Sequence, residues 1–366
     1  MSATWRLWWL TILLALPGAG PASARDSVER IRVGSAATGF LRPNGEPFRP
    51  WGFNYDRDHR MRLLEEYWEA EWGTVAGDLA EMKRLGANVV RIHLQLPAFL
   101  AGPLTPRGEA LVRLQRFLRL AERTGLWVNL TGLGCYRRDR VPAWYNDLSE
   151  AGRWESQAVF WRAVARAAAH SPAVFCYNLM NEPFVPGQAR APGDWLAGEL
   201  GGFSYVQAIT LDPAGRPRSE IARAWVRRLR TVIRSEDARA LITVGLLPET
   251  RPTDSFFGFD PAVMAEELDF LSVHLYPRAE KPEEARAVLQ ACTTAKPLVV
   301  EEIFPLAMAP APLMTFVRTH CHRVVGWLSF YWGQPPEELA RGTTQAEAWT
   351  HDWLVRWQLL SRNCGR

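Results

Sequence analysis

The sequence alternates short apolar runs with longer amphipathic stretches, and this alternation continues along almost the whole chain. The eight apolar runs lie at 51–55, 88–94, 126–133, 173–183, 240–246, 268–277, 297–304 and 324–332. Stretches with helical spacing follow most of them, at 74–87, 109–125, 156–170, 219–236, 282–292, 311–321 and 345–360. Strands that alternate with helices pair in parallel, and near-continuous apolar strands are covered on both faces.

Eight such units predict the α/β fold class and a single (β/α)8 TIM barrel with long loops on its catalytic face. An open doubly wound sheet usually carries a glycine-rich phosphate loop, and no G-x-G-x-x-G or Walker motif follows a strand in this sequence. The stretch 183–218 contains Gly and Pro throughout and is expected to be a long loop. Because long loops in compact domains are often functional, we expect it at the mouth of the barrel.

The first 24 residues have the pattern of a secretory signal peptide. Arg6 precedes an apolar run of about ten residues, and the small residues that follow end in the A-x-A pattern Ala22-Ser23-Ala24. That apolar run is short for a membrane span. We therefore expect cleavage after Ala24, a catalytic domain over 25–366, and a secreted or periplasmic protein without stable membrane insertion. An uncleaved anchor is the alternative.

Charge and cysteine usage argue against several classes of partner. The net charge is +4 at pH 7, but basic residues are spread along the chain and paired with acidic ones, so no nucleic acid partner is expected. The five cysteines include no C-x-x-C, which argues against a zinc ribbon or a redox motif. His320 and His322 lie at the end of an expected helix with no third ligand nearby, and we expect no metal and no cofactor. An exported chain allows disulfides. Cys292 and Cys321 are candidate partners, although sequence does not establish the pairing, and Cys176 is expected to be a buried thiol.

Polar and aromatic side chains gather at the carboxyl ends of the runs, where barrel enzymes place their chemistry. In chain order they are Arg91, His93, Asn181, Glu182, His274, Tyr276, Glu301, Glu302, Trp327, Tyr331 and Trp332. Alternate residues of a strand share a face, so Arg91 and His93 are expected to point together toward the barrel axis, as are His274 and Tyr276.

Glu301 and Glu302 are adjacent, so they are expected to point in opposite directions and only one is expected to reach the site. A carboxylate that faces the helix layer is costly unless it is paired. The other Glu is therefore expected near the strand end, close to a cation or solvent.

Two carboxylates on separate strands suit hydrolysis of a glycosidic bond. One donates a proton to the leaving oxygen, and the other attacks the anomeric carbon or activates water. One carboxyl must therefore hold a proton while the other is ionised. Arg91 is a candidate to keep Glu302 charged, because a neighbouring cation favours the ionised form. Asn181 suits a sugar hydroxyl, and Trp332 suits the apolar face of a pyranose.

Six stretches, taken in order, resemble the clan A glycoside hydrolases and most closely glycoside hydrolase family 5, the cellulase family. They are WGFNY at 51–55, NVVRIHL at 88–94, YNLMNEP at 177–183, SVHLYP at 272–277, PLVVEEIF at 297–304 and GWLSFYW at 326–332. The resemblance implies a retaining double displacement with two Glu, acting on a β-linked glucan, mannan or related β-glycoside. The expected partner is an oligo- or polysaccharide substrate, and the expected state is a monomer.

The resemblance also implies roles for single residues. Glu182 matches the acid/base, and Asn181 matches the Asn that contacts the sugar 2-hydroxyl. Glu302 matches the nucleophile, with Glu301 as its competitor. The remaining matches are to substrate-binding or supporting positions and comprise Arg91, His274, Tyr276 and Trp332, with Trp327 as the rival to Trp332.

The third run departs from the pattern of the family, which often carries D-x-H there. This sequence has Asn129 and Thr131 instead, which indicates a divergent subfamily, and His93 is a candidate to fill part of the space. Trp144 and Trp195 lie in expected loops and are candidates to line a sugar cleft. The segment 56–73 is a candidate to narrow one end of that cleft and to favour short substrates.

Two other interpretations stay open. One is a catalytically impaired carbohydrate-binding barrel, against which the presence of both carboxylates argues. The other is a metal-dependent barrel hydrolase, which normally needs several His and Asp at strand ends, whereas the first run ends here without an H-x-H.

Overall fold

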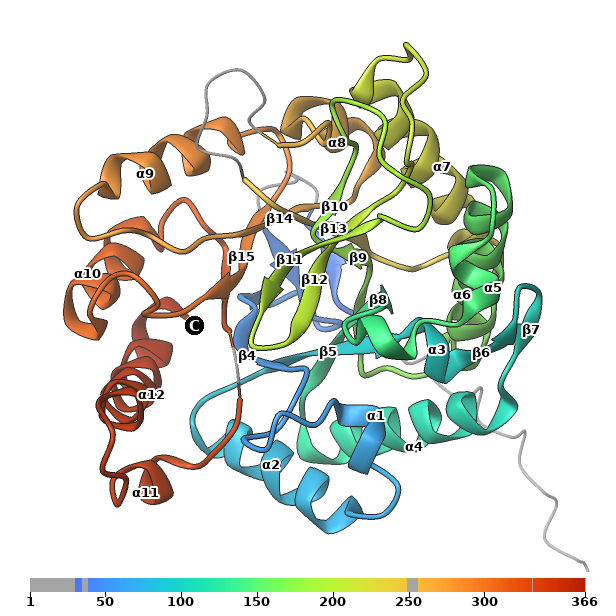
Figure 1. The fold of residues 1–366 in the computed structure, drawn as a ribbon. Coiled ribbons are helices and arrows are strands. Elements are labelled where there is room, and N and C mark those ends of the chain that lie inside the picture. The colour runs from blue at the N-terminus through green and yellow to red at the C-terminus, as the bar shows by residue number, and fades with distance from the viewer. Residues whose placement is uncertain (1–29, 35–38, 249–255, 331, 366) are drawn as a thin grey trace, which may run out of the picture.

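A closed barrel of eight parallel strands forms the centre of the protein (Figure 1). The computed structural model describes residues 30–34, 39–248, 256–330 and 332–365. Around the barrel the strands follow the order β13–β14–β15–β16–β4–β5–β8–β9. Their bounds are β4 Trp51–Tyr55, β5 Val89–Gln95, β8 Trp127–Gly134, β9 Val174–Asn181, β13 Ile242–Leu246, β14 Leu271–His274, β15 Leu298–Ile303 and β16 Gly326–Ser329. The predicted (β/α)8 barrel is confirmed.

Helices form a ring outside the barrel (Figure 1). The longer ones are α2 Trp72–Arg84, α4 Gly108–Thr124, α6 Glu150–Ala168, α7 Arg218–Glu236, α8 Pro261–Glu267, α9 Pro282–Ala291, α10 Pro310–His320 and α12 Gln345–Cys364. Short helices occur at α1 Leu64–Tyr67, α3 Leu96–Phe99, α5 Ala143–Asn146 and α11 Pro336–Leu339, and a 3-10 turn at Arg138–Arg140. None of the helices in the described ranges has the length and hydropathy of a membrane span. The predicted signal peptide lies outside these ranges.

Local sequence signals explain several helix ends. Thr344 accepts a hydrogen bond from the backbone N–H of Glu347, whose carboxylate bonds back to Thr344, so α12 begins with a capping box. Helix α8, which the sequence pattern does not predict, begins where Asp260 accepts from two backbone N–H groups next to Pro261. With only seven residues it is too short to show a helical period.

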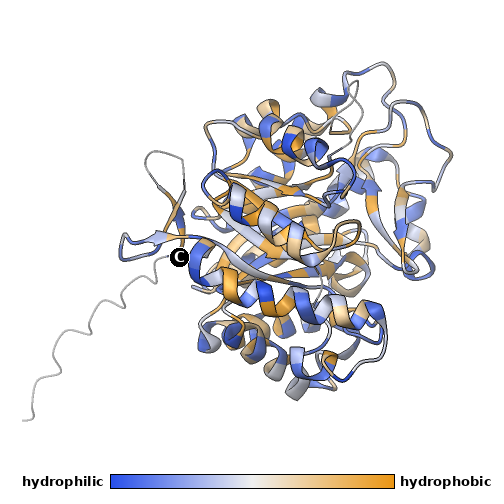
Figure 2. Cartoon of the chain, turned by 90° about the vertical axis from the view of Figure 1, so that its left-hand side faces the viewer, coloured by the Kyte–Doolittle hydropathy of each residue, from blue (hydrophilic) through white to orange (hydrophobic). Residues whose placement is uncertain are grey.

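An apolar layer fills the amino-terminal end of the barrel. A small antiparallel sheet of β1 Arg32–Val33, β2 Phe40–Leu41 and β3 Pro47–Phe48 covers this end. The ring of Phe40 packs edge-on against Phe175 and Phe270, with centroid distances of 5.2 and 5.1 Å. Hydrophobic residues also concentrate in the barrel strands and on the helix faces against them (Figure 2). Buried polar residues of the barrel therefore gather toward the opposite end.

The predicted loop 183–218 contains a three-stranded sheet at the mouth of the barrel. Its strands are β10 Pro183–Phe184, β11 Leu196–Leu200 and β12 Phe203–Ala208, paired in the order β10–β12–β11. The turn between β11 and β12 is Gly201-Gly202, with φ of 60° and 81°, values that favour glycine. Two strand-like runs separated by Gly-Gly predict a hairpin. The many Gly and Pro residues elsewhere in the segment led to the expectation of a loop instead. A second short hairpin pairs β6 Leu100–Gly102 with β7 Thr105–Pro106.

Backbone and side-chain hydrogen bonds hold β12 against the barrel mouth. The N–H of Gln207 donates to the carbonyl of Glu182 at 3.2 Å, and its side-chain amide donates to the carbonyl of Leu133 at 3.0 Å. The N–H of Ser204 donates to the carbonyl of Tyr136 at 2.8 Å. Strand β12 therefore crosses the carboxyl ends of β8 and β9.

The disulfide differs from the candidate pair. Cys321 is bonded to Cys364, with 5.6 Å between the Cα atoms, so the bond joins the ends of α10 and α12. Cys292 is a free, buried thiol at the end of α9, and the expected Cys292–Cys321 pair is wrong. Cys321, at the end of α10, lies beside the end of α12 rather than beside α9, because α10 packs against the C-terminal helix α12. Cys176 is a buried thiol, as expected.

Counting alkylated cysteines tests this arrangement. Denatured, unreduced protein is expected to take up a thiol reagent at Cys135, Cys176 and Cys292 only, because the other two are joined. Reduction is expected to expose all five cysteines of the chain. Peptide mass analysis of the labelled protein gives the count, and a label on Cys321 before reduction would contradict the pairing.

Candidate active site

The carboxyl ends of β9, β14 and β15 bring two carboxylates and an imidazole together. His274 Nδ1 lies 2.7 Å from Glu182 Oε1 and 3.3 Å from Glu302 Oε2. One oxygen of each carboxylate and one nitrogen of His274 lie within 4.8 Å of one another. The hydroxyl of Tyr276 donates to Glu302 Oε2 at 2.6 Å. Four of the residues predicted at strand ends therefore form one cluster.

Arg91 is fully buried and links this cluster to two other strands. Its Nη1 donates to Glu302 Oε1 at 2.5 Å and to Asn54 Oδ1 at 2.8 Å, and its Nη2 donates to Asn181 Oδ1 at 2.9 Å. Burial acts to lower the pKa of Arg91, but the charges of Glu301 and Glu302 raise it above its ordinary value. The guanidinium therefore stays charged and supports Glu302, as the sequence predicts for its position.

The two carboxylates differ in their donors. Arg91 and Tyr276 both donate to Glu302, whereas His274 is the single side-chain partner that the described residues give to the carboxyl of Glu182. Burial raises the pKa of Glu302 most strongly, the charge of Glu182 adds to this, and His274 and Arg91 act against it. Burial therefore acts against ionisation of Glu302, while the donors Arg91 and Tyr276 favour its ionised form.

His274 carries a positive charge at neutral pH. Burial lowers the pKa of its imidazole, but the charge of Glu302 and the hydrogen bond to Glu182 more than offset this and raise the pKa to about 9. Both ring nitrogens then carry hydrogen. The ring can donate from Nδ1 toward Glu182 while Nε2 faces a third carboxylate.

The backbone of Glu182 is held in an uncommon conformation. Its φ is 44°, in the left-handed region that a residue with a side chain rarely adopts. Such a conformation costs on the order of 1–3 kcal/mol and persists only where surrounding structure holds it. The hydrogen bond from Gln207 to its carbonyl supplies part of that support. Strand β9 ends at this turn, which directs the Glu182 side chain into the mouth.

Glu301 does not follow the predicted alternation. The pairing of β15 shifts between Val273 and His274 on one side and between Val300 and Ile303 on the other, so the strand is irregular where the two Glu residues lie. The side chain of Glu301 is 0% exposed and lies 3.5 Å from Arg91 Nε and 3.4 Å from His274 Nε2. The expectation that only one Glu reaches the site is therefore wrong, although Glu301 does lie beside cations.

His93 lies behind the cluster. Its Nδ1 lies 2.5 Å from the hydroxyl of Tyr136, and its Nε2 lies 3.1 Å from Asn54 Oδ1 and 3.2 Å from Arg91 Nη1. Burial, and then the charge of Arg91, lower the pKa of His93 well below its usual value. A neutral His93 thus contacts both Arg91 and Asn54, one of the groups that hold Arg91. Tyr136, which follows the third run after Gly134 and Cys135, is a functional candidate that sequence reasoning missed.

The structure does not present Trp332 as an open sugar platform. Its side chain is 1% exposed, and its ring packs edge-on against Phe53 at 5.4 Å. The aromatic residue of the eighth unit that faces the site is Phe330, whose ring lies 6.0 Å from Tyr276. Trp327 is fully buried as well. Tyr331 lies outside the described residues.

The two loop tryptophans differ in their burial. Trp195 is buried and donates to Asn146 Oδ1 at 2.8 Å, so the expectation that it lines a cleft is wrong. Trp144 is partly buried and packs edge-on against Tyr145, and its cleft-lining role stays a prediction.

An aromatic wall stands beside the cluster, made of Tyr136, Tyr205 and Phe330 with the Asp56–Arg57 ion pair. Arg57 Nη1 donates to Tyr205 Oη and to Asp56 Oδ2, both at 2.7 Å, and the guanidinium lies 5.3 Å from the Phe330 ring centre. The rings of Tyr136 and Tyr205 are 4.7 Å apart. This aromatic wall joins Asp56 and Arg57, at the start of segment 56–73, to Tyr205 of β12.

Asn181 belongs to the same network. Its Oδ1 accepts from Arg91, and its Nδ2 donates to the carbonyl of Tyr205 at 3.1 Å. The side chain therefore connects the cluster around His274 to the aromatic wall. Its predicted contact with a sugar 2-hydroxyl stays a prediction.

Glu182, His274 and Glu302 also have the spacing of a metal site, the one such group found among the described residues. Hydrogen bonds already engage all three side chains, from His274 to Glu182 and from Tyr276 and Arg91 to Glu302. The geometry is that of a hydrogen-bonded acid–imidazole cluster.

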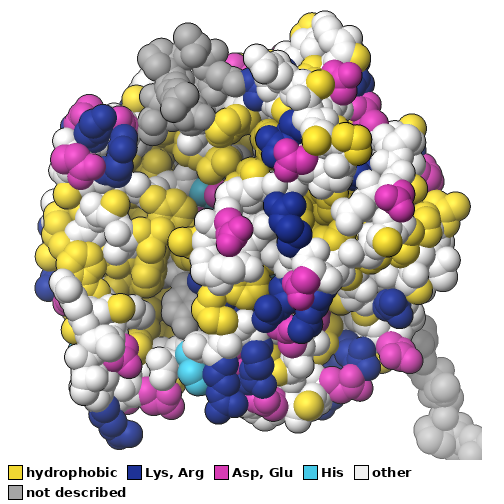
Figure 3. All heavy atoms as spheres, in the orientation of Figure 1, with side chains coloured by type: hydrophobic (Ala, Val, Ile, Leu, Met, Phe, Trp, Pro, Cys, Tyr) yellow, Lys and Arg dark blue, Asp and Glu magenta, His cyan; other side chains and the backbone are white. Residues whose placement is uncertain are grey.

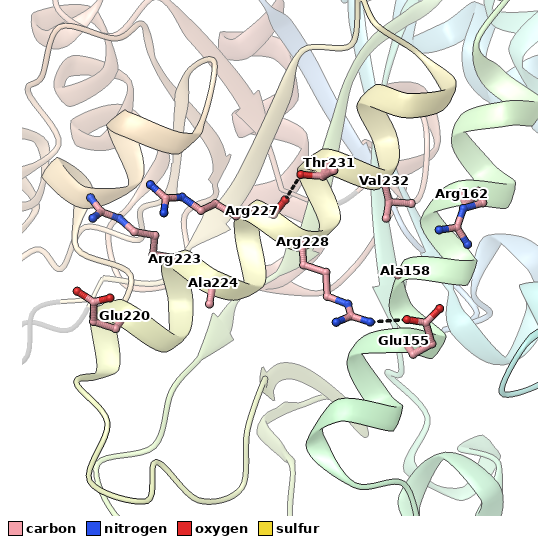
Figure 4. Close-up of a pocket in the computed structure, with 10 residues that line it drawn as sticks. All are labelled: Glu155, Ala158, Arg162, Glu220, Arg223, Ala224, Arg227, Arg228, Thr231 and Val232. Atoms are coloured by element: carbon pink, nitrogen blue, oxygen red, sulfur yellow. Dashed lines mark hydrogen bonds and ion pairs between the residues drawn. The ribbon is translucent and has the colours of Figure 1, made fainter.

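The face with the mouth is hollowed near its centre. In Figure 3 apolar side chains surround this hollow, and a histidine is visible within it. A separate groove of about 550 Å³ lies on the outer flank between α6 and α7. Most of the arginines that line it form ion pairs with carboxylates, as Arg228 does with Glu155 (Figure 4). The cluster at the mouth is therefore the better candidate for catalysis.

Several solved structures share this fold. A β-1,4-mannanase from the sea hare Aplysia kurodai has a TM-score of 0.60 and 14% identity, covering 92% of this chain and 99% of that one. An exo-β-1,4-mannosidase from an Opitutaceae bacterium has a TM-score of 0.65 and 17% identity, covering 91% and 62%. GH5_18 from Streptomyces cattleya, in complex with Manβ1-4GlcNAc, has a TM-score of 0.60 and 19% identity, covering 86% and 81%. No protein-family model and no curated protein matches the sequence.

At these identities the likeness establishes a shared barrel fold. The fold that the family 5 motifs imply is thereby confirmed, and the GH5_18 structure carries the name of that family.

Replacing Arg91 tests the charge network. Arg91→Met leaves Glu301 and Glu302 buried without their shared cation, so the free energy of unfolding is expected to fall by about 3–5 kcal/mol. Denaturant unfolding followed by circular dichroism measures this. Arg166→Met is the matched control, because Arg166 makes an exposed pair with Glu236, and it is expected to unfold like the wild type. Equal stability of both variants would contradict the role of Arg91.

Proposed function

We propose that the protein is a retaining glycoside hydrolase that cleaves β-mannosides by double displacement. The observation that carries the proposal is the approach of Glu182 and Glu302 around His274, with their nearest oxygens within 4.8 Å. Retaining glycosidases hold their carboxyl groups about 5–5.5 Å apart, whereas inverting enzymes leave about 6.5–9.5 Å for a water molecule. The mannanase and mannosidase names of the similar structures support mannose as the sugar.

In the first step, Glu302 attacks the anomeric carbon while Glu182 gives its proton to the glycosidic oxygen. The bond between the anomeric carbon and that oxygen breaks, and the leaving alcohol departs with the proton. Tyr276 and Arg91 hold Glu302 ionised and oriented for attack. The product of this step is a mannosyl ester of Glu302, and Glu182 is left as a carboxylate.

In the second step, Glu182 acts as the base. It takes a proton from a water molecule whose oxygen attacks the anomeric carbon, and the ester bond to Glu302 breaks. Mannose is released with its original anomeric configuration, and both carboxyl groups return to their starting protonation. His274 contacts both residues and is charged, so it stabilises whichever of them is negative at each stage.

The aromatic wall favours short substrates or chain ends. It crosses the mouth through a hydrogen-bonded path from Asn181 through Tyr205 to Arg57, so a second sugar on that side would have to displace packed side chains. We infer that one terminal β-mannosyl residue enters the site. The exo-β-1,4-mannosidase among the similar structures supports this inference. Export through residues 1–24 and a monomeric state belong to the same proposal.

Removing either carboxyl tests the mechanism. Glu302→Gln and Glu182→Gln are each expected to lower kcat for mannobiose by roughly a hundredfold or more, because the nucleophile or the acid is lost. Wild-type activity is expected to survive a chelator. Proton NMR of the first-formed product is expected to show retained configuration. A requirement for added metal, or an inverted product, would contradict the proposal.

Opening the aromatic wall tests the preference for chain ends. Tyr205→Ala is expected to raise the ratio of mannotetraose to mannobiose hydrolysis by roughly tenfold, the effect of one altered pocket contact. Leu200→Ala, at an exposed position of the same sheet, is the matched control and is expected to leave the ratio unchanged. Long oligosaccharides released from mannan by the wild type would contradict the inference.

A further inference from the structure

A third carboxylate, that of Glu301, lies in the barrel beneath the two proposed catalysts. Asn129 donates to its Oε2 at 3.0 Å, and Asn178 donates to its two oxygens at 2.7 and 2.8 Å. Ser272 donates to its Oε1 at 2.9 Å. These neutral donors come from β8, β9 and β14, so four strands cooperate to hold one ionised side chain. Burying the ionised carboxylate of Glu301 costs free energy, so a functional reason for its presence is expected.

Gly245 on β13 leaves the room that Glu301 and His274 need to approach each other. A Cβ atom at this position would lie 2.9 Å from His274 Nε2, closer than real Cβ contacts, and 3.0 Å from Glu301 Oε1, which is a tight contact. The backbone N–H of Gly245 also donates to Asn178 Oδ1 at 3.0 Å and fixes the amide that serves Glu301. Four strands therefore accommodate the approach of Glu301 to His274, with hydrogen bonds from β8, β9 and β14 and space at Gly245 of β13.

The imidazole of His274 thus stands between two carboxylates. Nδ1 faces Glu182 at 2.7 Å, and Nε2 faces Glu301 at 3.4 Å. With Arg91 and His274 positive and Glu301 and Glu302 negative, the buried charges cancel while Glu182 still holds its proton. Without the charge of Glu301, the same protonation state would leave one uncompensated buried cation, which is strongly unfavourable.

We propose that Glu301 is a positioning residue that acts through His274 to keep the proton on Glu182. This inference rests on the proposed hydrolysis. With Glu301 ionised, Glu182 and His274 together hold two protons, one on the carboxyl and one extra on the ring. Without it they hold one, and because imidazole is the stronger base, that proton stays on His274. Glu182 would then be ionised and unable to protonate a leaving oxygen.

Other charged and titratable groups face the cluster and enter the same equilibrium. From the elements packed around it these are Arg91 and His93 of β5, Tyr136 after β8, Tyr205 of β12, Tyr276 after β14, Glu302 of β15 and the Asp56–Arg57 pair after β4. His93 is neutral, and Asp56 and Arg57 neutralise each other. Of the carboxylates beside His274, Glu301 alone has no proposed covalent or proton-transfer step.

The pKa values of Glu301 and His274 are shifted in the directions that this role requires. Burial raises the pKa of Glu301, but the charge of Arg91 and then the contacts with His274 lower it to about 2, so Glu301 stays ionised at every working pH. The same contact is one of the causes that raise the pKa of His274.

The test is the pH profile of Glu301→Gln, which removes one charge and keeps the shape. The leaving alcohol of mannobiose needs a proton. With this substrate the alkaline limb of the pH profile of kcat/KM is expected to shift to lower pH by about one unit or more. With 2,4-dinitrophenyl β-mannoside, whose leaving group needs no proton, the rate at neutral pH is expected to stay close to that of the wild type. A structural defect alone would lower both rates together.

Two further variants make the test specific. Glu267→Gln removes another buried carboxylate, which lies on α8 and pairs with Arg227 of α7, and is expected to leave the profile in place. The double variant Asn129→Asp with Glu301→Gln exchanges a hydrogen-bonded amide and carboxylate, so the cluster keeps its charge. Its alkaline limb is expected to return toward that of the wild type, and it serves also if the single variant fails to fold.

A substrate-free measurement separates this inference from the proposed function. NMR titration of ring-labelled His274 is expected to give a lower pKa in Glu301→Gln than in the wild type. A wild type that hydrolyses neither mannoside would overturn the proposed function, and the titration would still test the pair. An unchanged His274 titration, an unchanged mannobiose profile, or a double variant that behaves like the single one would overturn the role of Glu301.

Discussion

The buried guanidinium of Arg91 is the interaction on which the site depends. It lies on β5 and reaches Asn54 on β4, Asn181 on β9 and Glu302 on β15, so one side chain sets the positions of groups from three other strands. A planar fork of fixed donors is suited to this, and a lysine would not reproduce it. The charge also makes two adjacent buried carboxylates possible. Without the cation, neither Glu301 nor Glu302 could stay ionised at low cost.

The two ends of the barrel differ in composition. The amino-terminal end holds apolar packing that stabilises the fold, and the carboxyl end holds the polar candidate site. Phenylalanines from β2, β9 and before β14 pack at the amino-terminal end, where burial of aromatic area stabilises the closed barrel. Polar groups then replace apolar ones toward the mouth. Because barrel strands carry the polar groups, hydrogen bonds between strands set their positions, and the proposed electrostatic catalysis requires such preorganisation.

Sequence predicts the barrel well because alternation of strands and helices is a local signal repeated many times. It also identifies Glu182, His274, Tyr276 and Glu302, since each ends an apolar run. It does not identify the irregularity of β15, because a bulge depends on neighbouring strands, and so Glu301 was expected on the wrong face. The aromatic wall was missed for a similar reason. Tyr205 and Tyr136 meet only after β12 folds back over the mouth.

The irregular strand and the third carboxylate have a common explanation in charge. A regular β15 would place Glu301 in the helix layer, where no described cation of the site lies, and would leave Arg91 and His274 with one carboxylate between them. The bulge turns the side chain inward, and Gly245 provides the space. In the proposed state, with the proton on Glu182, the negative charges of Glu301 and Glu302 then match the positive charges of Arg91 and His274. On this argument the departure from alternation is what lets neighbouring residues of a single strand supply the proposed nucleophile, Glu302, and a second carboxylate, Glu301, that balances the charges of Arg91 and His274.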